Sequence, residues 1–272
     1  STTTFVGMVA AVSAYTSLPR VVAQLTLNTA TRPCVPRAVA SSRAAHLGAT
    51  VHSRARLPSV RTYSKRLHVR MGPPIPPSAD FIGHTVGKGK HRLAVYLDYT
   101  CPFSGKMYKM LFGQVAPLYA DKLRVTFYHQ VQPWHPQSTL AHEAALAVAK
   151  VAGEDAFWKF SALLFDNMEA LMDVNTIDMS RRQIYTKLAE MAESVGVDKS
   201  KVMAQLQLNE EAIANGQQNP GNAVTQSLKW EIKASRQMSI HVSPTTTLNG
   251  LLYDTSSGWT LDQWKELLDP LE

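Results

Sequence analysis

A short apolar run that leads into a cysteine-proline pair constrains this chain more than any other stretch of it. Leu93 to Leu97 (Leu-Ala-Val-Tyr-Leu) is rich in residues that favour strands, and it predicts a buried strand. Pro102 suits the first position of a helix, because its missing N–H would be unpaired there in any case. Apolar residues then recur at helical spacing as far as Val115. We therefore expect a helix that begins directly after Cys101.

Cys101 would then lie at a helix N-terminus. The unpaired backbone N–H groups and the positive end of the helix dipole favour a thiolate there, and the thiolate is the nucleophilic form of cysteine. Asp98-Tyr99-Thr100 predicts the turn that ends the strand, with Asp98 as its cap, and Lys106 is available to favour the anion. The alternative is that Cys101 is a small buried hydrophobic residue without activity.

Cysteine spacing limits the remaining chemistry. The chain has two cysteines, Cys34 and Cys101, so no disulfide framework is expected. No Cys-x2-Cys or His-x3-His spacing occurs, and we expect no metal site. His135 and His142 could approach the cysteine and tune it, although surface or core-edge positions are more usual for such histidines.

Charge is distributed unevenly along the chain. Residues 1–79 contain ten of the 28 Lys and Arg residues and no Asp or Glu, which leaves 18 basic and 21 acidic side chains for the rest. This argues against a nucleic-acid-binding face on the folded domain, and the absence of a run of 18 apolar residues predicts no membrane span. An acid-free segment rich in Ala, Ser, Thr and Arg is typical of an organelle transit peptide.

The end of this segment indicates where it would be cut. Arg61-Thr62-Tyr63-Ser64 resembles the pattern at which mitochondrial presequences are cleaved, so we expect a mitochondrial protein with a mature start near Ser64. Plastid import is the alternative, because the two kinds of transit peptide overlap in composition. Retention of residues 1–72 as a basic arm against a partner is a further alternative.

Further elements are expected on both sides of a helical region. Predicted strands cover residues 81–86, 123–128, 239–242 and 245–248, with Asn249-Gly250 as a hairpin turn before Leu251-Leu252-Tyr253. Predicted helices cover residues 141–151, 156–172, 182–195, 202–214, 222–238 and 261–268. The two strands that flank the Cys101 helix should pair in parallel, in a sheet of four or five strands.

Two separated motifs carry a family resemblance. Asp-x-x-Cys-Pro-Phe-Ser (residues 98–104) and Val-Ser-Pro-Thr (residues 242–245) together resemble the active-site corner and cis-proline loop of DsbA-like thioredoxin-fold proteins. The resemblance covers about residues 80–270. It implies an α/β, thioredoxin-like fold with an inserted helical domain. The expected division is an arm at 1–72, thioredoxin-like parts at 73–138 and 217–272, and an inserted helical domain at 139–216.

The resemblance also implies a site. Cys101 would be the nucleophile, and Pro102, Phe103, Ser243 and Pro244 would contact the substrate, with Pro244 in the cis form. Ser104 stands where many relatives carry a second cysteine, so any redox chemistry must be monothiol, through a mixed disulfide. The hydroxyls of Thr100 and Ser104 could donate hydrogen bonds to the sulfur.

Two classes of function follow. The first is a mitochondrial monothiol thiol-disulfide oxidoreductase or glutathione-dependent enzyme, with protein thiols or glutathione as partners, glutathione as a co-substrate and no other cofactor. Kappa-class glutathione transferases share this plan and present a hydroxyl to glutathione, so Cys101 and Ser104 could bind that tripeptide. The second is a non-catalytic subunit of a large mitochondrial assembly (a respiratory complex, ATP synthase or ribosome).

Overall fold

A computed structural model describes residues 83–272, and the predicted arm at residues 1–72, its linker and residues 81–82 lie outside this range. Five strands form one sheet in the described residues, in the order β1-β3-β2-β4-β5. Their bounds are β1 His84–Val86, β2 His91–Leu97, β3 Leu123–His129, β4 Thr245–Leu248 and β5 Leu251–Tyr253. β2 and β3 are parallel, as predicted, and the other pairs are antiparallel.

The sheet is built around β2 and β3. Side chains in β3 alternate strictly between buried and half-buried positions, so one face of the strand enters the core, and Val95 of β2 lies opposite Phe127 of β3. The chain crosses between the two strands through α1 (Pro102–Met110), the π-helical turn η1 (Leu111–Val115) and α2 (Ala116–Leu118). Ala116 donates its N–H to the carbonyl of Leu111, five residues back, directly before Pro117, which has no N–H to continue the pattern.

A helical region follows β3, as predicted. It comprises α3 Ser138–Ala152, α4 Glu154–Asp166, the 3-10 turn η2 Met168–Leu171, α5 Asp173–Thr176, α6 Arg181–Ser194, α7 Lys199–Leu206 and α8 Glu210–Ala214. The predictions of single helices over 156–172 and 202–214 were wrong. In the first range the α-helix ends at Asp166, and a separate 3-10 turn, η2, follows. In the second range Gln207 adopts an extended conformation that ends α7, and Asn209 caps the new helix α8 by accepting the N–H of Ala212.

The C-terminal part returns to the sheet after α9 (Thr225–Gln237). The predicted strand at residues 239–242 was wrong. Ser239 has φ 60°, and the N–H of Ile240 bonds to the carbonyl of Ser235 at 2.9 Å, so this segment closes the C-terminus of α9 as a Schellman turn. The predicted hairpin at Asn249 and Gly250 is confirmed, since both have positive φ between β4 and β5.

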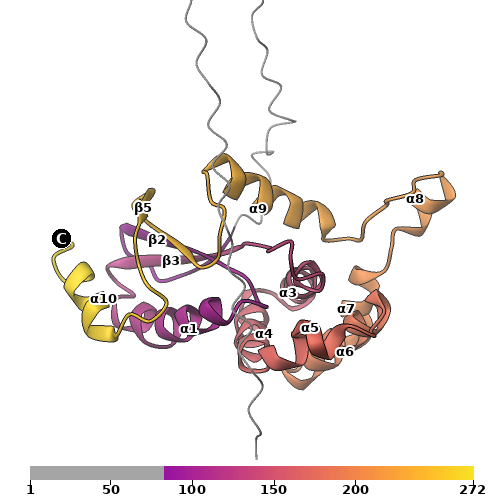
Figure 1. Cartoon of the computed structure of the whole chain (residues 1–272), viewed down its shortest axis with the longest axis horizontal. Coiled ribbons are helices and arrows are strands. Elements are labelled where there is room, and N and C mark those ends of the chain that lie inside the picture. The colour runs from indigo at the N-terminus through magenta and orange to yellow at the C-terminus, as the bar shows by residue number, and fades with distance from the viewer. Residues whose placement is uncertain (1–82) are drawn as a thin grey trace, which may run out of the picture. The chain divides into compact units, whose positions relative to one another are not determined.

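Helices cover both faces of the sheet (Figure 1). α1 and the C-terminal helix α10 (Leu261–Leu268) lie on one face, α9 lies on the other, and the helices α3–α7 lie beyond one end of the strands. A cluster of buried aromatic side chains fills the junction between the sheet and α4: Tyr99, Tyr108, Phe127, Phe157 and Phe165. No helix of residues 83–272 is long and apolar enough to cross a membrane. The division into segments at 72, 138 and 216 stays a prediction.

Candidate active site at Cys101

Cys101 is the N-cap residue of α1. Its backbone is extended, Pro102 follows at the first helical position, and the Cys101 carbonyl accepts the first helical hydrogen bond from Gly105 at 3.1 Å. The first turn of α1 carries no acidic residue, and the Cys101 side chain is partly exposed. Cys101 is therefore not part of the fully buried core.

A second segment completes the corner. The Ser243–Pro244 peptide bond is cis, as the resemblance implied, and the Cys101 thiol donates a hydrogen bond to the carbonyl of Ser243, with an Sγ–O distance of 3.5 Å. Pairing of Tyr96 in β2 with Thr245 in β4 brings the two segments together, because the C-terminal end of β2 lies beside the first residue of the antiparallel strand β4. The hydroxyl of Ser243 is buried and has no hydrogen-bond partner among the described residues.

Ser104 lies on the inner side of α1. It is fully buried, and its Oγ accepts the backbone N–H of Asp98 at 3.2 Å. The Thr100 hydroxyl likewise donates to the Asp98 carboxylate, at 2.8 Å. The expectation that these hydroxyls donate to the sulfur was wrong for the resting corner: neither makes a hydrogen bond to Cys101 within the described residues, and the Thr100 hydroxyl donates to Asp98 instead. A substrate cannot reach the Ser104 hydroxyl without movement of α1.

Asp98 holds this corner together. Its buried carboxylate accepts hydrogen bonds from the Thr100 N–H at 2.8 Å, the Gln132 N–H at 2.8 Å and the Ser138 hydroxyl at 2.9 Å. The prediction that Asp98 caps the turn is confirmed. Burial by itself would raise the pKa of Asp98, but His142 and the Thr100 hydrogen bonds outweigh burial and hold the pKa below its ordinary value. The Asp98 carboxylate thus forms hydrogen bonds with three segments: the turn after β2, the loop after β3 and the start of α3.

Apolar side chains flank the sulfur on both segments. Phe103 is 58% exposed and Val242 is 57% exposed, and they belong to the Cys101 corner and the cis-proline loop respectively. The Lys106 ammonium lies 5.9 Å from the centre of the Phe103 ring, so this cation is directed to the ring. Exposed apolar groups beside a nucleophile can bind the side chains of an extended peptide.

The histidines named from sequence have different positions. His135 is partly exposed and pairs with Asp173 at 3.2 Å, on the loop before α3. His142 is fully buried in α3 and lies 3.7 Å from Asp98, so it reaches the Cys101 corner only through that carboxylate. Neither residue is in hydrogen-bond contact with the sulfur, and only His142 can influence it, indirectly.

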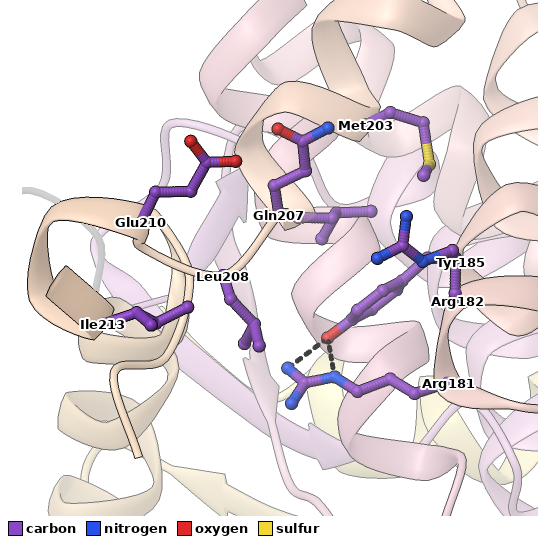
Figure 2. A pocket seen from close by; sticks show the side chains of 9 residues that line it. Arg181, Arg182, Tyr185, Met203, Gln207, Leu208, Glu210 and Ile213 are labelled. Atoms are coloured by element: carbon purple, nitrogen blue, oxygen red, sulfur yellow. Dashed lines mark hydrogen bonds between the residues drawn. The ribbon is translucent and has the colours of Figure 1, made fainter. Parts of the chain in front are cut away.

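A separate hollow lies between α6, α7 and α8, with a volume of about 390 Å³ (Figure 2). Arg181 donates two hydrogen bonds to the Tyr185 hydroxyl, at 2.7 and 3.0 Å, and Tyr185 in turn donates to the buried Glu143. Cys101 does not line the hollow. We therefore assign it no part in the thiol chemistry.

The sheet order, the helical insertion and the Cys101–Pro244 corner are those of a DsbA-like thioredoxin fold, with a single thiol in the described corner. No protein-family model matches the chain, and neither does any curated protein. Solved structures do match.

One match is a Pseudomonas syringae protein described as a candidate protein-disulfide isomerase, with a TM-score of 0.56 and 26% identity over 68% of this chain and 96% of that chain. The thiol-disulfide exchange protein alpha-DsbA2 from Wolbachia pipientis has a TM-score of 0.52 and 14% identity over 71% of this chain and 89% of that one. MdbA, a thiol-disulfide oxidoreductase from Actinomyces oris, has a TM-score of 0.51 and 17% identity, over 69% and 84%. The described part of this chain has the fold of these DsbA-like proteins.

Proposed function

We propose that this chain is a monothiol thiol-disulfide oxidoreductase that uses glutathione as its co-substrate. The observation that carries the proposal is the partly exposed Cys101 thiol at the N-terminus of α1, 3.5 Å from the Ser243 carbonyl. Solved proteins with the same fold are described as a candidate protein-disulfide isomerase, a thiol-disulfide oxidoreductase and a thiol-disulfide exchange protein, which supports the same class of chemistry here. Ser104 in the partner position limits the reaction to one protein thiol.

The exchange can be written with one cysteine. The Cys101 thiolate attacks the glutathione sulfur of a mixed disulfide GS–SR, a Cys101–SG disulfide forms, and RS⁻ leaves and takes a proton from water. A second glutathione thiolate then attacks the glutathione sulfur of that disulfide. Oxidised glutathione forms, and the Cys101 thiolate is released. The net reaction is RS–SG + GSH → RSH + GSSG, so one free glutathione is consumed, one disulfide is exchanged for another, and no metal or further cofactor is needed.

Backbone and apolar groups supply the binding contacts. An extended substrate can pair with the backbone at Ser243, while Phe103 and Val242 contact its side chains. Pro102 and Pro244 shape this surface because neither offers an N–H that competes with the substrate. Protein thiols with apolar neighbours are therefore the preferred substrates of the proposal.

The proposed location is the mitochondrion. The support is the acid-free N-terminal segment, which ends in Arg61-Thr62-Tyr63-Ser64, and a plastid remains the alternative. N-terminal sequencing of the protein isolated from the organelle should find a start between Ser64 and Gly72. An intact Ser1 terminus in the organelle would contradict the proposed cleavage.

A second function is favoured by a different observation. Val174 and Ile177, on and beside α5, are 80% and 81% exposed, and large exposed apolar side chains that lie close together mark contact surfaces. Together with the buried Ser104, this supports a non-catalytic subunit that packs within a larger mitochondrial assembly, such as a respiratory complex, ATP synthase or ribosome.

One comparison separates the two functions. In the full-length chain, Cys101→Ser should abolish the glutathione-dependent reduction of a small mixed disulfide, while Cys34→Ser, the same change at the other cysteine, should leave it intact. The rate of iodoacetamide alkylation against pH should show a faster reaction at Cys101 than in an unfolded control peptide. An inactive wild-type chain that alkylates no faster than the control would instead favour the packing subunit.

A further inference from the structure

Three buried side chains with ligand chemistry meet away from the sulfur. His84 comes from β1, His129 from the end of β3 and Glu231 from α9. One ligand atom of each lies within 4.8 Å of the others, and the three residues are 1%, 0% and 0% exposed. The rings of His84 and His129 stand perpendicular, with centroids 5.4 Å apart. Two imidazoles and a carboxylate are a common ligand set for transition metals.

Each of these residues also has a buried atom without a partner. Within residues 83–272, His84 Nε2, His129 Nε2 and Glu231 Oε1 make no hydrogen bond. Buried polar atoms are nearly always paired, because an unpaired one loses its hydration without compensation. Three such atoms on three neighbouring side chains indicate a shared partner.

The hydrogen bonds of the other atoms fix which nitrogens carry protons. His84 Nδ1 lies 2.9 and 3.0 Å from the two carboxylate oxygens of Glu154, which only accept, so Nδ1 carries the hydrogen. The His84 Nε2 then keeps its lone pair. This is the arrangement in which a metal-bound histidine is oriented by a carboxylate.

The second histidine is oriented through a relay. His142 Nε2 lies 3.7 Å from the Asp98 carboxylate, which favours a hydrogen on that nitrogen and leaves His142 Nδ1 as an acceptor. His129 Nδ1 then donates to His142 Nδ1 at 2.6 Å, and His129 Nε2 keeps its lone pair. Glu231 Oε2 accepts the backbone N–H of His129 at 2.9 Å, which leaves Oε1 available.

We propose that His84, His129 and Glu231 bind one divalent transition-metal ion of the zinc type, which joins β1 and β3 to α9. Two imidazole lone pairs and a carboxylate oxygen, all withdrawn from water, form a set of ligand atoms that one cation would pair. In a tetrahedral site with bonds of about 2.0–2.1 Å the ligand atoms lie about 3.4 Å apart. The ligand atoms here lie within 4.8 Å of one another, so they close by at most about 1.4 Å on binding. Full burial excludes substrate from the ion, and its role is structural.

Metal content and affinity test this proposal. The full chain, produced with Zn²⁺ in the growth medium, should contain one equivalent of zinc by elemental analysis. Glu231→Gln keeps the shape of the side chain and removes its charge, and it should weaken Zn²⁺ binding at least about 100-fold in competition with a chelator. His135→Gln, a histidine paired with a carboxylate outside the cluster, and Cys101→Ser should both bind as wild type does.

A second measurement does not depend on any variant. Wild-type chain refolded with Co²⁺ should show the visible absorption bands of a tetrahedral ion with nitrogen and oxygen ligands, and its thermal midpoint should exceed that of chain refolded with a chelator. A wild-type chain that folds without stoichiometric metal, with equal midpoints in the two conditions, would overturn the proposal. So would undiminished Zn²⁺ affinity in a folded Glu231→Gln variant.

Discussion

The carboxylate of Asp98 accepts a hydrogen bond from the hydroxyl of Ser138 at 2.9 Å, and this contact joins the Cys101 corner to the first helix of the helical region. Both residues are fully buried. The acceptor belongs to the turn after β2 and the donor to the first residue of α3. The position of the sulfur therefore depends on the helical region as well as on the sheet.

Loss of the Asp98 anion should lower the stability of the folded protein. Asp98→Ala leaves the N–H groups of Thr100 and Gln132 buried without their acceptor, and we expect the free energy of unfolding to fall by about 3–5 kcal/mol. Urea denaturation followed by circular dichroism measures the change. Ser138→Ala removes a single neutral donor and should cost about 1 kcal/mol. Equal losses in the two variants would show that the anion has no special part.

Asp98 should also govern stability in acid. The folded pKa of Asp98 is lowered from its ordinary value of 3.8, so the charged form favours the folded state. Its contribution is complete above that value and is lost as the pH falls through the lower, folded pKa. The free energy of unfolding of the wild type should therefore fall as the pH is lowered from 5 to 2, by about 1.4 kcal/mol for each unit of pKa shift. The thermal midpoint, which measures this loss, should fall over the same range.

The control for the acid prediction is Asp98→Asn, which cannot titrate at this position. Its midpoint should start lower and change less over the same pH range. Parallel curves for the wild type and the Asn variant would assign the acid sensitivity to other carboxylates.

Phe103 should act on substrate binding and not on folding. It is 58% exposed, so Phe103→Ser should alter the free energy of unfolding by less than about 0.5 kcal/mol. Under the proposed function, kcat/KM for a peptide disulfide with apolar side chains should fall about tenfold, the equivalent of about 1.4 kcal/mol. Turnover of a small hydrophilic disulfide should be retained.

Leu118→Ser is the matched control for Phe103, since Leu118 is 55% exposed at the far end of the same helical crossover. It should leave both substrates unaffected. A similar fall in kcat/KM for both variants would point to a general effect of surface polarity.

Ser104→Cys should convert the corner to a dithiol. Residues at i and i+3 at a helix start have Cα atoms close enough for a disulfide. The weaker acceptor strength of sulfur toward the Asp98 N–H should cost about 1 kcal/mol in the reduced protein. Mild oxidation should then remove two thiols per chain in a thiol titration, whereas wild type should lose none within the corner. Unchanged thiol counts in the variant would contradict the prediction.

The strand-to-helix corner could be predicted because its signals are local. Apolar strand formers, a turn aspartate and a proline at the first helical position follow one another within about ten residues, and each acts on the backbone beside it. The ends of helices within the helical region were harder to predict from the sequence. The break in the predicted helix at Gln207, for example, has neither a proline nor a glycine nearby. At Ser239 a residue other than glycine takes the left-handed conformation, which sequence patterns rarely reveal.

The buried cluster was missed for a different reason. Its residues come from β1, β3 and α9, so no spacing motif contains them, and the expectation that the chain has no metal site was drawn from spacing alone. One signal was available. His129 continues the alternation that places Val125 and Phe127 in the core, and a histidine on a buried strand face needs a polar partner.

The pairing of β2 with β4 sets the order in which this protein can become active. Leu93 lies opposite Leu248, so the loop between the two strands contains the whole helical region, and closing it is the slowest kind of contact for a folding chain. A nascent chain can already present the Cys101 thiol while the Ser243 carbonyl is still inside the ribosome. During synthesis the thiol is therefore made long before the cis-proline loop, and only the pairing of β4 with β2 brings the two together.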